Sequence, residues 1–430
     1  MSEATTLEGC LGGVGREVRA ILERALDDRD LTEAEGVTLL GATGDDLRAL
    51  TLVADTLRRR QAGDAVGYVV NRNINFTNAC VKACRFCAFA RGHRSEQAYF
   101  LPMDEVVRRA VEAERLGATE VCVQAGLAPG MSPTLYAEAC RAIRRAAPAL
   151  HLHAFSPEEI KYGAGLARVP VRAFLEELKD AGLGSLPGTS AEILDDAVRA
   201  RIAPTRITTA EWIEVVTSAH AIGLPTTSTI MFGHVESELE RVRHLLLLRS
   251  IQRETRGFTE LVPLSFVHDE APMTLRHSVP GLRAGPTGHD VVRLFAVARL
   301  ALGRDIAHLQ ASWVKEGLRE AQSLLACGAD DLGGTLMNES ISTSAGSGHG
   351  QLVTPATLRR VIRDAGRAPV QRDTRYGVLR AFSADRAAVD APEPLDDVHD
   401  PEATFGTYAS LTLDPRFRFH LPTVDAEADA

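Results

Sequence analysis

The chain has 430 residues, of which 45% are hydrophobic and 24% are charged, and its formal net charge is −9. This length suffices for one large domain of about 250–350 residues with appended segments. The negative charge argues against a general attraction to nucleic acid. No stretch approaches the roughly 20 apolar residues of a membrane span, and the first residues lack the basic and apolar regions of a signal peptide. We therefore expect a cytoplasmic protein that does not bind membranes, in a reducing compartment that suits free thiols.

The predicted elements fall into three segments. Leucines at helical spacing predict a helical N-terminal segment over residues 1–62. Over residues 63–380, helical stretches separate eight expected strands, at 69–76, 120–125, 150–155, 182–186, 224–231, 260–266, 308–312 and 330–333. Eight such units predict an α/β fold, a TIM-type (β/α)8 barrel, with a doubly wound open sheet as the alternative. Residues 381–430 are acidic and contain prolines, which predicts a flexible or loosely packed extension.

Cys80, Cys84 and Cys87 form a CxxxCxxC motif directly after the first expected strand. Thiolates are the ligands of iron–sulfur clusters, and three of them can hold three irons of a [4Fe–4S] cluster and leave the fourth open. The loop would lie at the carboxyl ends of the strands, where a barrel places its active site. Two alternatives are a Cys3His zinc site completed by His93 and buried thiols without a metal.

Three polar residues are candidates for catalysis. Period two places His151 and His153 on one face of the third strand, and we favour His153 because it is nearer the carboxyl end. His234 and Glu236 lie in the loop after the fifth strand, where catalytic groups gather. The alternatives are a structural histidine on the strand and an ordinary solvated loop.

Further residues are candidates for binding a cofactor or another polar ligand. Gln124 and Gly126 lie in a small-residue turn after the second strand, where a ligand can approach the main chain closely. Glu192 is expected in the first turn of a helix, where it binds a cationic group or only caps the helix. Thr227 and Ser228 carry hydroxyls on a barrel strand, which are costly to bury unless they are paired.

The cysteine spacing resembles that of the radical S-adenosylmethionine (SAM) superfamily. This resemblance implies that the open iron binds the amino and carboxylate groups of SAM, and that the reduced cluster cleaves SAM to methionine and a 5′-deoxyadenosyl radical. It also implies that Phe86 lies near the adenine and that the turn at Gln124 and Gly126 meets the amino group of SAM. Relatives tend to have Gln-Gly-Gly where this chain has Gln-Ala-Gly.

Longer stretches, between about residues 30 and 380, resemble the CofH-type family of deazaflavin biosynthesis. They are residues 67–78, 87–91, 153–157, 184–192, 231–236, 263–268 and 334–342. The resemblance implies a transferase that breaks the Cα–Cβ bond of L-tyrosine and adds the 4-hydroxybenzyl group to 5-amino-6-(D-ribitylamino)uracil. It also implies an electron donor for the cluster. Because the sequence holds one CxxxCxxC motif, a second radical SAM enzyme would close the deazaflavin ring.

Two other functions remain open at this point. Menaquinone-pathway radical SAM enzymes, aminofutalosine synthase and dehypoxanthine futalosine cyclase, share the barrel and the cysteine spacing. Residues 68–78 and 264–268 favour the CofH-type family over them. A non-catalytic zinc-binding protein is the alternative from a different class.

Overall fold

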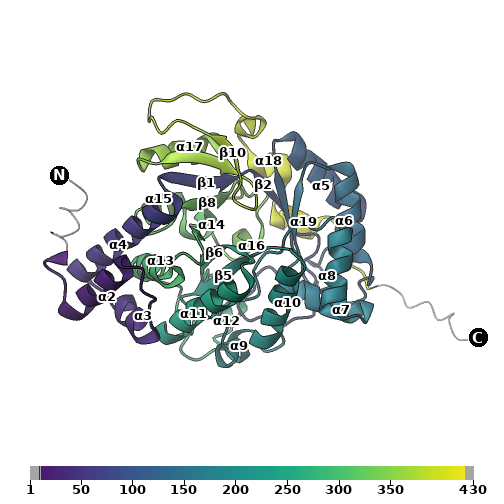
Figure 1. The fold of residues 1–430 in the computed structure, drawn as a ribbon. Coiled ribbons are helices and arrows are strands. Elements are labelled where there is room, and N and C mark those ends of the chain that lie inside the picture. Colours follow the sequence, from purple (N-terminus) through teal and green to yellow (C-terminus); the bar gives the residue numbers. More distant parts are fainter. Residues whose placement is uncertain (1–8, 10, 422–430) are drawn as a thin grey trace, which may run out of the picture.

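Eight parallel strand positions form a closed ring in the computed structural model, which describes residues 9 and 11–421 (Figure 1). The strands of the ring are β1 (Ala65–Val69), β2 (Asn71–Ile74), β3 (Glu120–Val123), β4 (His151–Ala154), β5 (Thr226–Phe232), β6 (Phe258–Ser265), β7 (His308–Leu309) and β8 (Asp331–Gly334). The parallel ladders run β2-β3-β4, β5-β6-β7 and β1-β8. Isolated parallel bridges join these ladders, from His153 to Ser185, Leu186 to Thr226, Gln310 to Asp331 and Arg72 to Met337. The predicted (β/α)8 barrel is confirmed.

Two expected strands differ in detail. The first splits into β1, which pairs with β8, and β2, which pairs with β3. The fourth contributes only the bridges at Ser185 and Leu186, because Pro187 has no amide hydrogen and ends the run of strand hydrogen bonds. The ring is nevertheless complete at both places.

Helices surround the ring and pack their apolar faces against the strands (Figure 1). They are α5 (Met103–Arg115), α6 (Leu135–Ala146), α7 (Pro157–Ala167), α8 (Val171–Asp180), α9 (Asp196–Ile202), α10 (Thr209–Ala221), α11 (Glu238–Thr255), α13 (Gly288–Leu302) and α15 (Leu318–Leu324). The short helices α12 (Pro272–Leu275), α14 (Trp313–Glu316) and α16 (Ile341–Ser344) lie in the loops at the carboxyl ends of the strands. The start of α7 is strongly specified: Ser156 caps it, Pro157 occupies its first turn, and the Glu159 carboxylate accepts a hydrogen bond from the Ser156 amide.

The N-terminal segment forms α2 (Arg16–Leu26), α3 (Glu33–Leu40) and α4 (Gly44–Ala62), drawn in purple in Figure 1. Helices α3 and α4 pack against α11 and α13 on the outside of the barrel, and α2 packs against α3 and α4. Gly36 permits the close approach of α3 to α11, because a Cβ there would lie 2.7 Å from a methyl group of Val242. The helices expected before residue 63 are therefore present, and they cover one side of the barrel.

The chain after the barrel continues through α17 (Pro355–Asp364), β9 (Ala368–Arg372), β10 (Val378–Ala381), the 3-10 turn η1 (Pro394–Asp397), α18 (Pro401–Phe405), α19 (Tyr408–Leu413) and the 3-10 turn η2 (Pro415–Phe417). Strand β9 runs parallel to β1, and β10 runs antiparallel to β9. Helices α18 and α19, drawn in yellow in Figure 1, lie near β2 and α5. This part of the chain therefore returns to the barrel.

Most described residues of the C-terminal segment are exposed, as in a loosely packed extension, but the segment makes defined contacts with the rest of the chain. Acidic side chains there pair with arginines of α17: Asp390 Oδ2 lies 2.7 Å from Arg359 Nε, and Asp390 Oδ1 lies 2.8 Å from Arg363 Nη2. Leu395 and Phe419 are buried. An acidic stretch thus marks ion pairing here rather than disorder, and the acidic stretch at 424–430 lies outside the described residues.

Residues 372–376 cover the base of the barrel, at the N-terminal ends of its strands. Arg372 forms two hydrogen bonds, of 2.6 and 2.9 Å, to Asp331 at the start of β8. Thr374 donates a 2.7 Å hydrogen bond to Glu120 at the start of β3. The Tyr376 ring stacks on His308 at the start of β7, with 3.6 Å between the centroids. This segment therefore bridges strands from different sides of the ring.

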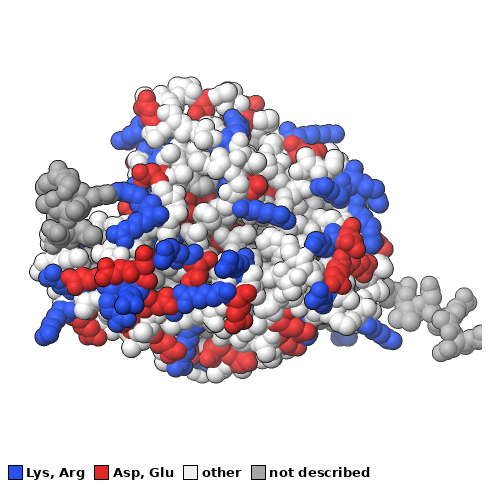
Figure 2. All heavy atoms as spheres, viewed as in Figure 1, with Lys and Arg blue, Asp and Glu red and all other residues white. Residues whose placement is uncertain are grey.

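Basic and acidic side chains are interspersed over the face shown in Figure 2. Within the described part of the chain, no helix combines the length and the apolar character needed to cross a membrane.

Candidate active site

A cavity of about 330 Å³, called the mouth cavity below, lies at the carboxyl ends of the barrel strands. Cys80, Cys84, Phe86 and Cys87 line it together. They belong to the cysteine loop, residues 77–91, which follows β2. The structure thus brings the three expected metal ligands and the expected adenine-binding aromatic to one wall of one cavity.

Main-chain hydrogen bonds hold the cysteine loop in place. The Cys80 amide donates to Arg91 O at 2.9 Å, and the Arg91 amide donates to Asn78 O at 2.8 Å. Further along, the Val81 amide donates to Leu127 O and the Arg85 amide to Ile202 O, both at 2.8 Å. The positions of the thiols are therefore set by the surrounding barrel and not by the loop alone.

The three thiols fit an iron–sulfur cluster better than a single metal ion. Burial raises the pKa of the Cys84 and Cys87 thiols, so a thiolate at either position needs a positive partner. Among the described residues, no three His, Cys, Asp or Glu side chains are placed to hold one ion. His93, the expected fourth zinc ligand, does not line the mouth cavity. In a cluster each thiolate binds its own iron, so the sulfurs need not converge on one point.

The turn after β3 packs directly against the cysteine loop. The Gly126 amide donates a 2.8 Å hydrogen bond to Thr77 O, and a Cβ at Gly126 would overlap the carbonyl oxygen of Ala79. Position 126 therefore requires glycine because of its contact with the main chain of the cysteine loop. Gln124 Oε1 accepts a 2.9 Å hydrogen bond from Thr189, and both Gln124 and Gly126 line the mouth cavity.

Glu159 positions the same turn from the start of α7. Its Oε1 accepts a 3.0 Å hydrogen bond from the Ala125 amide, and its Oε2 accepts from the amide and hydroxyl of Ser156 at 2.8 and 2.7 Å. Burial raises the pKa of Glu159 to about 7. The carboxyl group lines the mouth cavity, so it joins the first turn of α7 to the turn beside the thiols.

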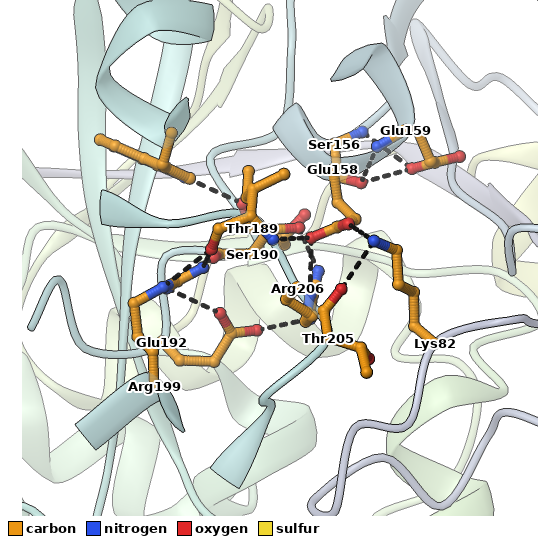
Figure 3. Close-up of polar contacts among 12 residues, drawn as sticks. Lys82, Ser156, Glu158, Glu159, Thr189, Ser190, Glu192, Arg199, Thr205 and Arg206 are labelled. Carbon is orange, nitrogen blue, oxygen red and sulfur yellow. Dashed lines mark hydrogen bonds and ion pairs between the residues drawn. The ribbon is translucent and has the colours of Figure 1, made fainter. Parts of the chain in front are cut away.

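A chain of alternating charges forms another wall of the mouth cavity (Figure 3). Lys82 Nζ lies 3.0 Å from Glu158 Oε1, and Arg206 Nε donates to Glu158 Oε2 at 3.1 Å. Arg206 Nη1 donates to Glu192 Oε1 at 2.9 Å, and Arg199 Nη1 lies 3.6 Å from Glu192 Oε2. Each carboxylate is thus held between two cations. Sequence reasoning found only Glu192 of this set, because the other members are far apart in the chain and share no motif.

The structure differs from the expectation that Glu192 opens a helix. Helix α9 begins at Asp196 and is capped by Asp195, whose carboxylate accepts from the amides of residues 197 and 198. Glu192 has a φ of 42°, a left-handed conformation, in the loop before the helix. Because it does not cap the helix, its carboxylate can form the ion pairs with Arg206 and Arg199. Glu192 also lines the mouth cavity.

Phe86 shares the cavity wall with this charged chain. The guanidinium carbon of Arg206 lies 5.8 Å from the centroid of the Phe86 ring, within cation–π range. The ring orientation is therefore coupled to the ion pairs of Arg206.

A second cavity of about 170 Å³, called the lumen cavity below, lies inside the barrel. It shares four polar residues with the mouth cavity, which are Asn73, Gln124, Thr189 and Thr229. Its other polar lining residues include Glu120, His153, Thr227 and Glu260, and it ends at Arg372 and Thr374 of the base segment. The two cavities therefore occupy one shaft between the cysteine loop and the covered base.

His153 projects into the lumen cavity as expected. Its Nδ1 shares the Ser185 hydroxyl with His151 Nε2, at 2.7 Å in each case. Burial lowers the pKa of His153 to about 4, so the ring is neutral near pH 7. Its Nε2 makes no hydrogen bond to a described residue and is available to a ligand.

Two buried carboxyl groups of the lumen cavity differ in their surroundings. Burial raises the pKa of Glu260 to about 7. Burial also opposes ionisation of Glu120, but His153 and the hydrogen bonds from Thr374 and Asn71 lower its pKa overall. Glu120 therefore supplies a fixed acceptor inside the barrel.

The two hydroxyl candidates of β5 have different positions. Thr227 lines the lumen cavity, and its Oγ1 accepts a 2.8 Å hydrogen bond from the Gly188 amide. Ser228 lines neither cavity, because β5 alternates its faces, and its hydroxyl donates to Glu260 O at 2.7 Å. Ser228 thus fixes the β5–β6 register and does not reach the shaft.

His234 and Glu236 also lie outside both cavities. His234 Nε2 donates to Met231 O at 3.0 Å, and its Nδ1 accepts from the Val235 amide at 2.8 Å. Glu236 accepts from the amides of Gly233 and His234, at 2.7 and 2.9 Å, and pairs with arginines of α11 and of the loop before α13. The sequence left open a catalytic loop or an ordinary solvated loop here. The structure shows a buried turn whose side chains bond its own main chain, and neither residue reaches the two cavities.

Comparisons with known proteins agree with this geometry. A family model described as the radical SAM superfamily matches residues 74–248, and one described as the CofH/MqnC C-terminal region matches residues 255–384. The chain is 47% identical, over 359 residues, to 5-amino-6-(D-ribitylamino)uracil–L-tyrosine 4-hydroxyphenyl transferase of Methanothermobacter thermautotrophicus, covering 83% of this chain and 96% of the relative. It is 48% identical to the protein of the same name from Methanocaldococcus jannaschii, covering 76% of this chain and 91% of the relative.

A longer relative matches over part of its length. The chain is 48% identical over 350 residues to FO synthase of Mycobacterium tuberculosis, which covers 81% of this chain and 40% of the relative. That relative therefore contains a further segment outside the match.

Solved structures share the fold. The hydrogenase maturase HydG is similar with a TM-score of 0.65 at 17% identity, covering 87% of this chain and 80% of HydG. Methylornithine synthase (PylB) is similar with a TM-score of 0.60 at 16% identity, covering 79% of this chain and 95% of PylB. At these identities the likeness concerns the barrel itself.

Proposed function

Since the chain belongs to the CofH family of the radical SAM superfamily, we propose that it transfers the 4-hydroxybenzyl group of L-tyrosine to 5-amino-6-(D-ribitylamino)uracil. The observation that carries this proposal is the 47% identity over 96% of an archaeal relative named for that activity. The family's cofactors, a [4Fe–4S] cluster and SAM, are those of this enzyme.

The cysteine loop is the proposed cluster site. Cys80, Cys84 and Cys87 would each bind one iron, and the bound cluster with SAM supplies a 5′-deoxyadenosyl radical. The free thiols on one cavity wall support this assignment. The main-chain bonds of the loop would keep the three sulfurs in place before the cluster is assembled.

SAM would occupy the part of the mouth cavity beside the cysteine loop. Phe86, Gln124, Gly126 and Glu192 line that part, as the resemblance to the family implies. Glu159 holds the turn at Gln124 and Gly126, and Arg206 holds Glu192 and the ring of Phe86. Such prior ordering reduces the entropy cost of positioning a ligand.

The ribityl chain of the acceptor would extend into the lumen cavity. Its hydroxyls can each donate and accept a hydrogen bond, and the cavity offers the carboxylate of Glu120, the free Nε2 of His153 and the hydroxyl of Thr227. Asn73, at the junction of the two cavities, has a buried Oδ1 without a hydrogen-bond partner, which suits a donor on the ligand.

The shaft, which is covered at its base, suits a radical reaction. Transfer of a hydrogen atom from the tyrosine amino group to the 5′-deoxyadenosyl radical would break the Cα–Cβ bond and release a 4-hydroxybenzyl radical and a glycine imine. The benzyl radical would add to the uracil, and the adduct radical would lose one proton and return one electron to the oxidised cluster. The covered base and the cysteine loop would exclude water and oxygen from these species. Holding both substrates in one shaft also keeps the reacting atoms near contact.

The proposed pathway needs two further proteins. An electron donor would reduce the cluster, and a second radical SAM enzyme would close the deazaflavin ring. The additional length of the FO synthase relative supports the second requirement, because that chain carries more than the segment matched here. A cytoplasmic location, where thiols stay reduced, completes the proposal.

Anaerobic turnover tests the function. The reconstituted enzyme is incubated with reductant, SAM, L-tyrosine and the ribitylaminouracil, and products are identified by mass spectrometry. We expect 5′-deoxyadenosine and a hydroxybenzyl–uracil adduct, each dependent on both substrates. Deoxyadenosine formed only with a futalosine-type substrate would instead assign the enzyme to the menaquinone pathway.

A further inference from the structure

Lys315 is a cation of the mouth cavity that lacks a partner. It lies in α14, directly after β7, and lines the cavity. The other two cations of the cavity lining are engaged, Lys82 by Glu158 and Arg206 by Glu158 and Glu192. In contrast, no described residue accepts a hydrogen bond from Lys315 Nζ, and no described carboxylate oxygen lies within 4.0 Å of it. Burial lowers its pKa, although Glu339, Glu316 and the thiol of Cys87 act against this effect.

The acidic groups nearest to Lys315 are already used by the main chain. Glu339 accepts from the Ser342 amide at 2.8 Å and from the Thr343 amide at 3.3 Å, and so holds the start of α16. Glu316 accepts from the Ser265 amide at 3.4 Å. Lys315 is half-buried, and a partly desolvated ammonium group without an acidic partner is unfavourable. A ligand that brings a negative charge would reduce this cost.

The ring topology separates Lys315 from the proposed SAM side of the cavity. Glu158 and Glu159 follow β4, the third strand position, and Lys315 follows β7, the seventh. In a ring of eight strands, the third and the seventh positions face each other across the barrel. Lys315 therefore approaches the shaft from the side opposite the charged chain of Figure 3.

We propose that Lys315 binds the carboxylate of the amino-acid substrate. This inference rests on the proposed function, in which L-tyrosine shares the cavity with SAM. The α-carboxylate is the anionic group that a tyrosine brings, and Lys315 is the cavity cation without an anion among the described residues. A charge-assisted bond here would fix the α carbon while the side chain remains free to react.

Lys315→Met tests the assignment, because methionine keeps much of the aliphatic length and removes the charge. Binding of L-tyrosine and of tyramine, which lacks the carboxylate, is measured by anaerobic calorimetry on the cluster-loaded enzyme with SAM. We expect tyrosine affinity to fall about 10- to 100-fold and tyramine affinity to stay unchanged. Lys315→Arg should retain most of the tyrosine affinity. Lys179→Met, at an exposed lysine of α8, is the matched control and should bind both ligands normally.

The outcomes separate this inference from the proposed function. If the wild-type enzyme binds no tyrosine and forms no adduct, the proposed function falls. If the wild type binds tyrosine and Lys315→Met binds it equally well, or loses tyrosine and tyramine alike, the lysine assignment is wrong while the function stands. A loss confined to SAM affinity would place Lys315 against the cofactor instead. Should Lys315→Met not fold, wild-type enzyme that binds tyramine as tightly as tyrosine would also overturn the assignment.

Discussion

The hydroxyl of Tyr408 donates a hydrogen bond of 2.7 Å to the carbonyl oxygen of Phe89. The same hydroxyl accepts a 3.0 Å hydrogen bond from Asn78 Nδ2, and the rings of Tyr408 and Phe89 lie 5.3 Å apart. Asn78 precedes the first cysteine and Phe89 follows the last. One tyrosine of the C-terminal segment therefore fastens both ends of the cysteine loop.

Tyr408→Phe should loosen the cysteine loop without unfolding the barrel. The change removes two hydrogen bonds, each worth about 1 kcal/mol, and keeps the ring contact. We expect lower iron content after reconstitution and faster cluster loss in air, both measured by iron assay and absorbance. Ser410→Ala, in the same helix, is the control, because its hydroxyl bonds only within its own turn. Equal cluster lifetimes in the two variants would contradict the fastening role.

Cys84→Ser should abolish cluster assembly and SAM cleavage while the far-ultraviolet circular dichroism stays close to that of the wild type. The reason is that serine is a poor ligand for this soft metal site. Iron and acid-labile sulfide are measured together with 5′-deoxyadenosine. Cys140→Ala, at a buried thiol of α6 outside both cavities, should retain the cluster. Persistent SAM cleavage by Cys84→Ser would reject the ligand assignment.

Gly126→Ala should displace the cysteine loop, because the added methyl group overlaps the carbonyl oxygen of Ala79. We expect the free energy of unfolding to fall by about 1–3 kcal/mol, together with reduced cluster content. Gly165→Ala provides the matched comparison, since nothing lies within 4 Å of its Cβ position on α7. That variant should gain roughly 0.5–1 kcal/mol. The free energy of unfolding of both variants is measured with urea. Equal changes in the two variants would show that the predicted clash is absent.

His244 should make the protein less stable as the pH drops from 7 to 5, whereas Glu159 and Glu260, whose pKa values burial raises to about 7, should act in the opposite direction. His244 Nε2 donates to Thr229 O and its Nδ1 accepts from the Leu194 amide, each at 3.0 Å. A second proton on Nδ1 would therefore face an N–H group and no hydrogen-bond acceptor. Burial lowers the pKa of His244 to about 3. The unfolded chain binds a proton below its ordinary pKa of about 6.5 and the folded chain does not, so acid favours unfolding.

For this histidine alone, the loss between pH 7 and pH 5 should be about 2 kcal/mol. His153 and His220, whose pKa values burial lowers to about 4, should add to the same trend. Urea unfolding at both pH values is compared between the wild type and His244→Gln. The variant should be less stable at pH 7 and should lose less stability on acidification. Parallel losses in the two proteins would rule out His244 as a contributor.

The sequence predicts best those features that residues close together in the chain form on their own. The three cysteines lie within eight residues, so their spacing alone places them on one loop, and the strand before them sets that loop at the rim. The same holds for Gln124 and Gly126, which belong to a single turn. The (β/α)8 ring could be predicted because its strands and helices alternate regularly along the chain.

Contacts between distant segments could not be predicted in this way. Arg206, Glu158 and Lys82 meet only after three separate segments fold together. Lys82 lies between the first two cysteines of the motif, but the motif does not indicate its partners. Lys315 was missed for the same reason. His234 and Glu236 show the converse error, because a polar loop after a strand can be buried when its side chains satisfy its own main chain.

The cover formed by residues 372–376 has a kinetic consequence. With the lower end of the barrel closed by Arg372 and Thr374, the described shaft opens at the mouth. A ligand in the lumen cavity must bind before the ligands of the mouth cavity, and it must dissociate after them. Steady-state patterns should therefore show compulsory ordered addition, with the uracil as leading substrate and its adduct as the last species released.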